Sequence, residues 1–310
     1  MNKTDVPILI LAFNRPDTTF KVFNAIREIK PKKLFIAVDG PRPGNEMDEI
    51  NVKKVREILS NVDWPCKVKK IFREKNLGSL NSTVGAITWF FENVEYGAIV
   101  EDDCLPSSDF FKFCAELLEK YKDDERIMHI GGNNFQRGWT RDKYSYYFSY
   151  YPYMWGWATW ARAWKKFDRT MGAYPELKNK GYFRDIYPNK LEETYIRRLI
   201  EGTYSGKNPT GWDNNWIFTL LTNNGLSIAP NKNLVKNIGF VENSVRTKPI
   251  DSFLSIDTQE MEFPLKHPPF IFRDRKTDER YIRWIYRTKL RKYFLMKTGL
   301  YKLFSKNKKN

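Results

Sequence analysis

The sequence predicts an α/β fold, in which a mostly parallel, twisted sheet is flanked by helices. Two observations support this prediction. In the first 125 residues, short apolar runs typical of buried strands alternate with segments whose apolar residues recur at helical spacing. Polar residues directly follow three of these runs, where a parallel sheet presents its ligand-binding edge. A strand–helix alternation of this kind indicates a doubly wound sheet.

The predicted elements follow in chain order. The expected strands are at 6–12, 34–38, 67–72 and 98–100; three of these are apolar runs, and 67–72 combines three lysines with three apolar residues. Each is followed by an expected helix with apolar residues three or four positions apart, at about 17–29, 52–59, 78–94 and 108–121. Asp17 and either Ser107 or Ser108 can cap two of these helices. After residue 130 the alternation loosens, and helices are expected near 190–201 and 212–223.

The polar clusters behind the strands are Asn14-Arg15, Asp39-Gly40 and Glu101-Asp102-Asp103. Ligands bind outside the carboxyl ends of the strands in such sheets, so the convergence of three clusters there predicts a binding site. Neighbouring carboxylates resist ionising together, and a divalent cation shared with substrate phosphates would compensate them. The alternative is a loop of solvated acids before a helix N-terminus, where negative charge is favourable. The position after a buried strand favours the functional interpretation.

Missing motifs exclude several classes of site. There is no G-x-x-x-x-G-K-[ST] loop, and no G-x-G-x-x-G follows the first strand, so a bound nucleotide would need a metal and scattered Arg and Lys. Two histidines and three cysteines provide neither a His-rich zinc site nor a Cys/His cluster. Neither histidine has a Ser or Cys partner in a recognisable hydrolase motif. The sparse, odd-numbered cysteines indicate a reducing compartment rather than a disulfide framework.

Two further segments allow two interpretations each. In Thr210-Gly211-Trp212-Asp213 the acid is either part of a capping box or a general base in the first turn of a helix. Spacing alone favours the cap. The turn Trp155-Gly156-Trp157 is either part of the core or a platform on which the apolar face of a sugar stacks.

Positive charge is concentrated at the C-terminus. The formal net charge is +16, and residues 280–310 contain eleven Lys or Arg, no acid and many aromatic residues. This composition favours an interfacial helix on an anionic membrane over a nucleic-acid-binding segment, so no nucleic-acid partner is expected. No run of about 18 apolar residues occurs, and no membrane-spanning helix is expected. The expected localisation is cytoplasmic, peripheral on the inner face of the membrane.

Five stretches stand in the order of the motifs of inverting GT-A-fold glycosyltransferases: ILAFNRP, VDG, IVEDDCLPSSDFFKF, MWGWATWARAW and GWDNNW. Over residues 6–247 the chain resembles this family, in particular N-acetylglucosaminyltransferase I and the bacterial polysaccharide-cluster sugar transferases that look like its catalytic domain. The resemblance implies a GT-A domain at 1–275, with a nucleotide-sugar-binding half at 1–130 and an acceptor-binding half at 131–275. The basic, aromatic, amphipathic tail is 276–310.

The resemblance also assigns roles to residues. It implies that Asp103 is the direct ligand of Mn²⁺ or Mg²⁺ and that Asp213 is the catalytic base. Asp213 is followed by Asn214-Asn215, where N-acetylglucosaminyltransferase I has two adjacent acids, and this departure singles out Asp213. The residues that the resemblance places around the nucleotide sugar are Asn14, Arg15, Asp39, Asn76, Glu101, Asp102, Ser244 and Arg246. The residues that it places around the acceptor are Trp155, Gly156 and Trp157.

The implied function is metal-dependent, inverting transfer of a sugar from a UDP-sugar to a hydroxyl of a glycan or lipid-linked glycan, in cell-surface polysaccharide synthesis. Two other classes remain open. A nucleotidyltransferase also uses a strand-end acid and a metal on an α/β sheet, although it usually has an N-terminal glycine-rich loop with Lys or Arg, which ILAFNRP matches poorly. A non-enzymatic protein that binds membranes or nucleic acid would explain the tail, but neither the converging acids nor Asp213.

Overall fold

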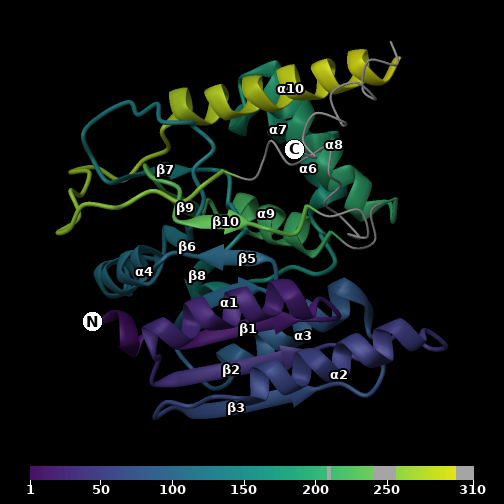
Figure 1. The fold of residues 1–310 in the computed structure, drawn as a ribbon. Coiled ribbons are helices and arrows are strands. Elements are labelled where there is room, and N and C mark those ends of the chain that lie inside the picture. Colours follow the sequence, from purple (N-terminus) through teal and green to yellow (C-terminus); the bar gives the residue numbers. More distant parts are fainter. Residues whose placement is uncertain (208–210, 241–255, 298–310) are drawn as a thin grey trace.

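The computed structural model describes residues 1–207, 211–240 and 256–297, the last nine of these by their backbone alone. The described chain forms an eight-stranded sheet with helices on both sides, and a separate two-stranded sheet (Figure 1). In sheet order, the strands of the large sheet are β3 (Lys67–Phe72), β2 (Lys33–Val38), β1 (Ile8–Ala12), β4 (Tyr96–Glu101), β8 (Trp157–Trp160), β6 (Ile127–Gly131), β9 (Leu226–Pro230) and β7 (Tyr146–Ser149). The small sheet pairs β5 (Cys104–Pro106) with β10 (Val235–Asn237). The helices are η1 (Lys3–Asp5), α1 (Pro16–Ile29), α2 (Glu46–Ser60), α3 (Gly78–Phe91), α4 (Ser108–Lys120), α5 (Ala161–Trp164), α6 (Tyr174–Asn179), α7 (Tyr182–Ile186), α8 (Lys190–Tyr204), α9 (Trp212–Thr222) and α10 (Arg275–Lys297).

The directions of the strands confirm the predicted α/β class with a mostly parallel sheet. β1 to β4 run parallel to one another, as do β6 and β9. β8 runs antiparallel between β4 and β6, and β7 runs antiparallel at the edge beside β9. The parallel strands are joined through helices, because a parallel neighbour requires a crossover connection.

Strand β1 is buried on both faces, which explains its uninterrupted apolar sequence. Ile8 and Ile10 belong to the core cluster that includes α1, α2 and α4. Leu9 and Leu11 belong to the cluster on the other face, which includes α3 and α9. Successive side chains of a strand point to opposite faces, so a strand between two helical layers must be apolar throughout.

Helix boundaries near the predicted site follow from local chemistry. α1 begins at Pro16, whose ring fixes the backbone for the first helical position, with Arg15 as the N-cap residue. Asp17, the expected cap, lies in the first turn of α1 instead. Ser107 rather than Ser108 caps α4, by accepting a hydrogen bond from the Phe110 amide at 3.4 Å. This cap fixes the start of the helix that follows the acidic turn.

A third core cluster lies where α8, α9 and α10 pack around aromatic residues of β7 and of residues 150–155, which follow β7 in the chain. Figure 1 shows α10 lying across α7 and α8. Near the start of α10, Ile282 belongs to this cluster and Asp278 is fully buried. The first turns of the predicted basic tail therefore pack against the body of the molecule, whereas residues 298–310 lie outside the described residues. No described helix has the length and apolar character that crossing a membrane requires.

Candidate functional site

The acidic turn lies where two neighbouring parallel strands end. Glu101, the last residue of β4, pairs with Leu11 near the end of β1. Asp102 and Asp103 form the turn that leads into β5, and each is only 8% exposed. The amide of Phe13, just past β1, donates a hydrogen bond to Asp102 Oδ2 at 3.0 Å. The sheet therefore brings both acids to its carboxyl edge.

Arg15 compensates the charge of this pair. Its Nη1 lies 2.5 Å from Asp103 Oδ2 and 3.9 Å from Asp102 Oδ1. Burial, and then the neighbouring charge of Asp103, raises the pKa of Asp102 to about 7, although Arg15 and the Phe13 amide oppose the rise. Asp102 is thus an acid that a bound cation would help to ionise.

The chain after β10 covers Asp103. β10 pairs with β5, and the amide of Ile238 donates to the Asp103 carbonyl at 2.8 Å. A Cβ atom on Gly239 would lie 2.2 Å from Asp103 Oδ2, so only glycine allows this close approach. Ser244 and Arg246, which the sequence placed at the nucleotide sugar, lie outside the described residues.

Asp39 and Asn76 join two loops at the ends of β2 and β3. Asp39 Oδ1 accepts hydrogen bonds from the amides of Gly40 at 3.0 Å and Leu77 at 3.1 Å, and Asn76 Nδ2 donates to the Gly40 carbonyl at 2.9 Å. A Cβ atom on Gly40 would lie 2.4 Å from the Lys75 carbonyl carbon. Burial raises the pKa of Asp39, and the two amides oppose the rise. Both residues therefore hold these loops together, whatever they bind.

Asn14 is directed toward α2. Its Nδ2 donates to Asp48 Oδ1 at 2.7 Å, and Asp48 also forms an ion pair with Arg42 at 2.5 Å. The Arg42 guanidinium lies 5.7 Å from the ring centroid of Phe13, next to the strand end. Asn14 thus positions Asp48 and Arg42, and Arg42 is a cation near the edge that the sequence analysis did not single out.

Asp213 and Trp155 lie in the wall of one aromatic pocket of about 320 Å³. This pocket lies among the segment 151–155, α8, α9 and α10. Its wall consists of Asn133, Phe135, Tyr151, Pro152, Tyr153, Met154, Trp155, Tyr195, Ile196, Leu199, Asp213, Asn214, Ile217, Tyr281 and Ile285. Asp213 Oδ1 accepts a hydrogen bond from the Asn214 amide at 3.1 Å, whereas Thr210, the other end of the expected capping box, lies outside the described residues. Asp213 is thus one acid of a mostly aromatic pocket.

The rest of the Trp155-Gly156-Trp157 turn faces the interior. Trp157 is 0% exposed and stacks on His129 with a centroid distance of 5.1 Å, so its ring belongs to the core. Gly156 has a φ of 67°, and a Cβ atom there would lie 2.7 Å from a methyl group of Val235. Of the three residues, Trp155 presents its ring to the pocket. Trp157 is buried because it is the first residue of β8, whose side chains are all buried.

His129, to which the sequence assigned no role, contacts two sides of this pocket. His129 is fully buried, and burial lowers its pKa to about 3, so it is neutral. Trp216 Nε1 in α9 donates to His129 Nδ1 at 3.2 Å, and His129 Nε2 donates to the Tyr153 carbonyl at 3.1 Å. His129 therefore connects α9, which carries Asp213, to the segment that carries Trp155. Its only sequence signal was a polar residue inside an apolar strand.

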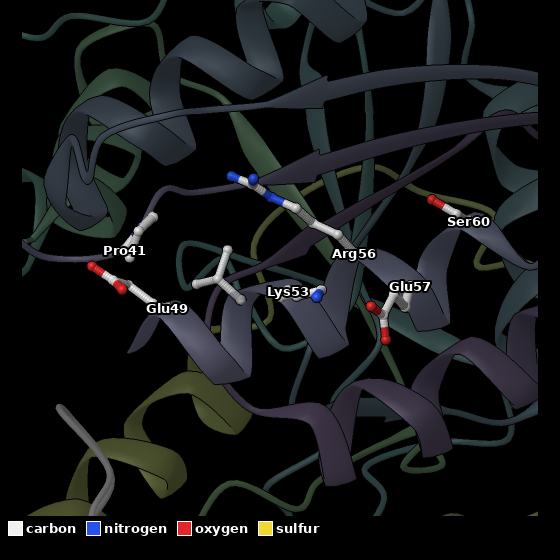
Figure 2. A pocket seen from close by; sticks show the side chains of 7 residues that line it. Pro41, Glu49, Lys53, Arg56, Glu57 and Ser60 are labelled. Atoms are coloured by element: carbon white, nitrogen blue, oxygen red, sulfur yellow. The ribbon is translucent and has the colours of Figure 1, made fainter. Parts of the chain in front are cut away.

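A second, shallower pocket of about 340 Å³ lies on the outer face of α2. Figure 2 shows Glu49, Lys53 and Glu57 projecting from this helix, with Pro41 near Glu49. None of the residues to which the sequence analysis gave a role lines it. Its acids and Lys53 are exposed, whereas Arg56 is half-buried and donates to the Arg73 carbonyl.

No group of three His, Cys, Asp or Glu side chains suited to holding a metal occurs in the described parts of the chain. Asp102 and Asp103 nevertheless fit a hard divalent cation that takes its other ligands from phosphates and water, as Mg²⁺ commonly does. The edge of the sheet can therefore bind anionic phosphate through Arg15 and a cation through the acids.

No family model matches the chain, and no curated protein matches it significantly. Among solved structures, a cytidylyltransferase from Leptospira borgpetersenii is 15% identical, with a TM-score of 0.33; the match covers 54% of this chain and 64% of that chain. HddC from Yersinia pseudotuberculosis is 9% identical, with a TM-score of 0.31 over 51% of this chain and 77% of that chain. A 4-diphosphocytidyl-2C-methyl-D-erythritol synthase from Anaerococcus prevotii is 11% identical, with a TM-score of 0.31 over 57% and 78%.

These neighbours correct the glycosyltransferase interpretation. They are nucleotidyltransferases, not relatives of N-acetylglucosaminyltransferase I. The predicted resemblance to GT-A glycosyltransferases is therefore corrected, together with the UDP-sugar donor, the glycan acceptor and the sugar transfer that it implied, because no such transferase is among these neighbours. At these low identities and TM-scores the likeness concerns the fold alone, and no residue of this chain takes a role from it.

Proposed function

We propose that this chain is a nucleotidyltransferase that binds a nucleoside triphosphate across the carboxyl ends of β1 and β4. The observation that carries the proposal is the buried pair Asp102-Asp103, with Arg15 Nη1 2.5 Å from Asp103 Oδ2, between two adjacent parallel strands. Ligands of doubly wound sheets bind at this edge. A guanidinium beside two carboxylates offers the groups that bind phosphate oxygens and a divalent metal.

The phosphates would be held by two arginines that follow neighbouring strands. Arg15 follows β1, and Arg42 follows β2 with its guanidinium beside Phe13. Arginine binds phosphate with several donors in a fixed plane, which suits it to this role without a glycine-rich loop. Asp103, with Asp102 beside it, would hold Mn²⁺ or Mg²⁺, and the bound metal would neutralise charge on the phosphate oxygens.

The second substrate would bind in the aromatic pocket. The ring of Trp155 in its wall lies 5.8 Å from that of Phe240, which directly follows the Gly239 that packs on Asp103. The pocket and the acid edge are therefore adjacent. An oxygen of this substrate would attack the α-phosphorus, pyrophosphate would leave, and Asp213 in the pocket wall would accept the proton from a hydroxyl nucleophile.

The test is a reaction panel that detects pyrophosphate. The protein is mixed with Mg²⁺, with CTP, UTP, ATP or GTP in turn, and with a series of phosphorylated sugars and alcohols. We expect pyrophosphate release with at least one nucleotide, its loss in Asp103→Asn, and its retention in Asp123→Asn, a control that removes an exposed acid. Release of a nucleoside diphosphate from a nucleotide sugar, with no pyrophosphate from any triphosphate, would contradict the proposal.

We also propose a peripheral location on an anionic membrane. Phe270 and Phe272, just before α10, are 39% and 56% exposed and stack with a centroid distance of 4.4 Å. The exposed Arg275 and Lys276 follow them. Exposed aromatic rings beside basic residues suit the interface of an anionic bilayer.

Vesicle flotation tests the membrane location. We expect binding to vesicles that contain phosphatidylserine, weaker binding at high salt, and further weakening in a Phe270→Ala and Phe272→Ala double variant. Equal binding to purely phosphatidylcholine vesicles, or no binding to either kind, would overturn it.

A further inference from the structure

Two acids and one base are buried together where α10 meets α8. Glu192 in α8 and Asp278 in α10 are both 0% exposed, and Arg273, just before α10, lies between them. Arg273 Nη2 contacts Glu192 Oε1, and its Nε lies 2.7 Å from Asp278 Oδ2. The guanidinium also stacks over the rings of Tyr150 and Tyr187, at 4.6 and 5.3 Å from their centroids. This charge triad, Glu192–Arg273–Asp278, joins α8, α10 and the segment behind β7.

The two acids of the charge triad are not equally satisfied. Asp278 accepts hydrogen bonds from Ser149 Oγ at 2.5 Å and from the Tyr150 amide at 3.1 Å. Glu192 Oε1 accepts one from the Tyr151 hydroxyl at 2.9 Å, but Glu192 Oε2 is buried with no hydrogen-bond partner among the described residues. A buried carboxylate oxygen without a donor is costly when the group is ionised. In the neutral acid the same oxygen can carry the proton.

Among the groups around the charge triad, Glu192 and Asp278 are the ones whose ionisation sets its pH dependence. The charged neighbours are Glu279, which adds negative charge near Glu192, and Asp274, which pairs with Arg141 at 2.7 Å. Burial raises the pKa of five tyrosines near the triad, so these hydroxyls stay neutral: Tyr147, Tyr151, Tyr153, Tyr187 and Tyr281. Burial also raises the pKa of Glu192 and raises that of Asp278 to about 6, although Arg273 opposes both.

We infer that the charge triad is a pH-sensitive clamp on α10, which keeps one proton while the helix is docked and loosens the helix when that proton leaves. With both acids ionised, one guanidinium faces two buried negative charges, and the second charge has no cation of its own in the triad. α10 supplies Tyr281 and Ile285 to the wall of the aromatic pocket, so a loosened helix would widen that pocket. This consequence rests on the proposed function of the pocket, whereas the clamp itself does not.

The sign of the pH dependence follows from the direction of the shifts. The folded state raises the pKa of both acids, so it binds the proton more tightly than the unfolded chain does. The stabilisation is therefore complete below the unfolded pKa of about 4 and is lost as the pH rises through the folded value, about 6 for Asp278. We expect α10 to be held most firmly at mildly acidic pH.

Hydrogen exchange of the full chain tests the clamp directly. Amide protection in α10 is measured between pH 5 and pH 8 and corrected for the intrinsic exchange rate. We expect protection in α10 to fall several-fold more than protection in α1 as the pH rises. Equal pH dependence in the two helices would overturn the inference without bearing on nucleotidyl transfer, which is assayed separately by pyrophosphate release.

Two variants separate the clamp from a general effect of charge. Glu192→Gln removes the excess negative charge, so its unfolding temperature should exceed that of the wild type at pH 8, with the gap closing by pH 5. Glu201→Gln in the same helix, at a partly exposed acid, should leave the pH dependence unchanged. If Glu192→Gln does not fold, Asp278→Asn serves instead. If Glu192→Gln, or Asp278→Asn in its place, unfolds at the wild-type temperature at both pH values, the clamp is also overturned.

Discussion

Two carboxylates and one arginine meet twice in this molecule, in surroundings that differ. At the sheet edge, Arg15 lies against Asp102 and Asp103, and the arginine side chain is 24% exposed. In the charge triad under α10, the Arg273 side chain is 9% exposed and both acids are fully enclosed. The same charges therefore serve different purposes. Partly solvated groups at a strand end can exchange partners with a ligand, whereas enclosed groups can only hold the elements that carry them.

The largest expected contrast comes from removing each arginine. Arg273→Ala leaves two acids buried without their cation, and breaking such a buried pair costs about 3–5 kcal/mol of unfolding free energy. Arg15→Ala should cost less than half of that, because water reaches the edge and Asp102, with its pKa already at about 7, can take up a proton. Urea denaturation of both variants at pH 7 measures the difference. Equal losses of unfolding free energy in the two variants would mean that the groups at the sheet edge are as shielded from water as those of the charge triad.

A close contact at the edge offers the next test. In Gly239→Ala the new Cβ would meet Asp103 Oδ2 at 2.2 Å, so the carboxylate or the chain has to move. We expect nucleotide affinity, measured by calorimetry with Mg²⁺, to fall about tenfold, or about 1.4 kcal/mol. Gly202→Ala in α8 is the matched control, since nothing lies within 4 Å of its Cβ and alanine favours a helix. Wild-type affinity in Gly239→Ala would show that Asp103 is not part of the binding site.

The smallest expected effect is a difference in pH profile between the two clusters. Asp102 and Asp278 both have a raised pKa, at about 7 and about 6, so each contributes stability at low pH that is lost as the pH rises through that value. Each group can contribute at most about 1.4 kcal/mol per pH unit in its window. Asp278→Asn should flatten the stability profile around pH 6, and Asp102→Asn around pH 7. A profile that neither variant alters would show that these acids ionise normally in the folded protein.

The sequence predicted the first half of the fold well, because β1, β2 and β4 are buried on both faces and therefore appear in the sequence as apolar runs. It also located the acids at the end of β4 and narrowed the cap of α4 to Ser107 or Ser108, since these are local patterns. The insertion of the antiparallel strand β8 between β4 and β6 was not predictable, because it depends on pairing between distant segments. The burial of Trp157 was not predictable for the same reason, because Trp157 is the first residue of β8.

The two charge clusters were not predictable for a similar reason. Arg15 and Asp103 are 88 positions apart, and Glu192 and Arg273 are 81 positions apart, so no local spacing connects them. Glu192 and Asp278 look in sequence like ordinary charged residues of exposed helices. The functional resemblance was wrong as well, since the same strand-end acids suit more than one kind of nucleotide-dependent transferase.

The central claim is that the acid edge binds a nucleoside triphosphate. Calorimetric titration of CTP, UTP, ATP and GTP into the wild-type protein, with and without Mg²⁺, tests it most directly. The account predicts metal-dependent binding of at least one triphosphate, loss of that binding in Asp103→Asn, and weaker binding in Arg15→Ala at unchanged fold by circular dichroism. If no triphosphate binds, or if binding is the same in Asp103→Asn and Arg15→Ala as in the wild type, the edge is not a nucleotide site.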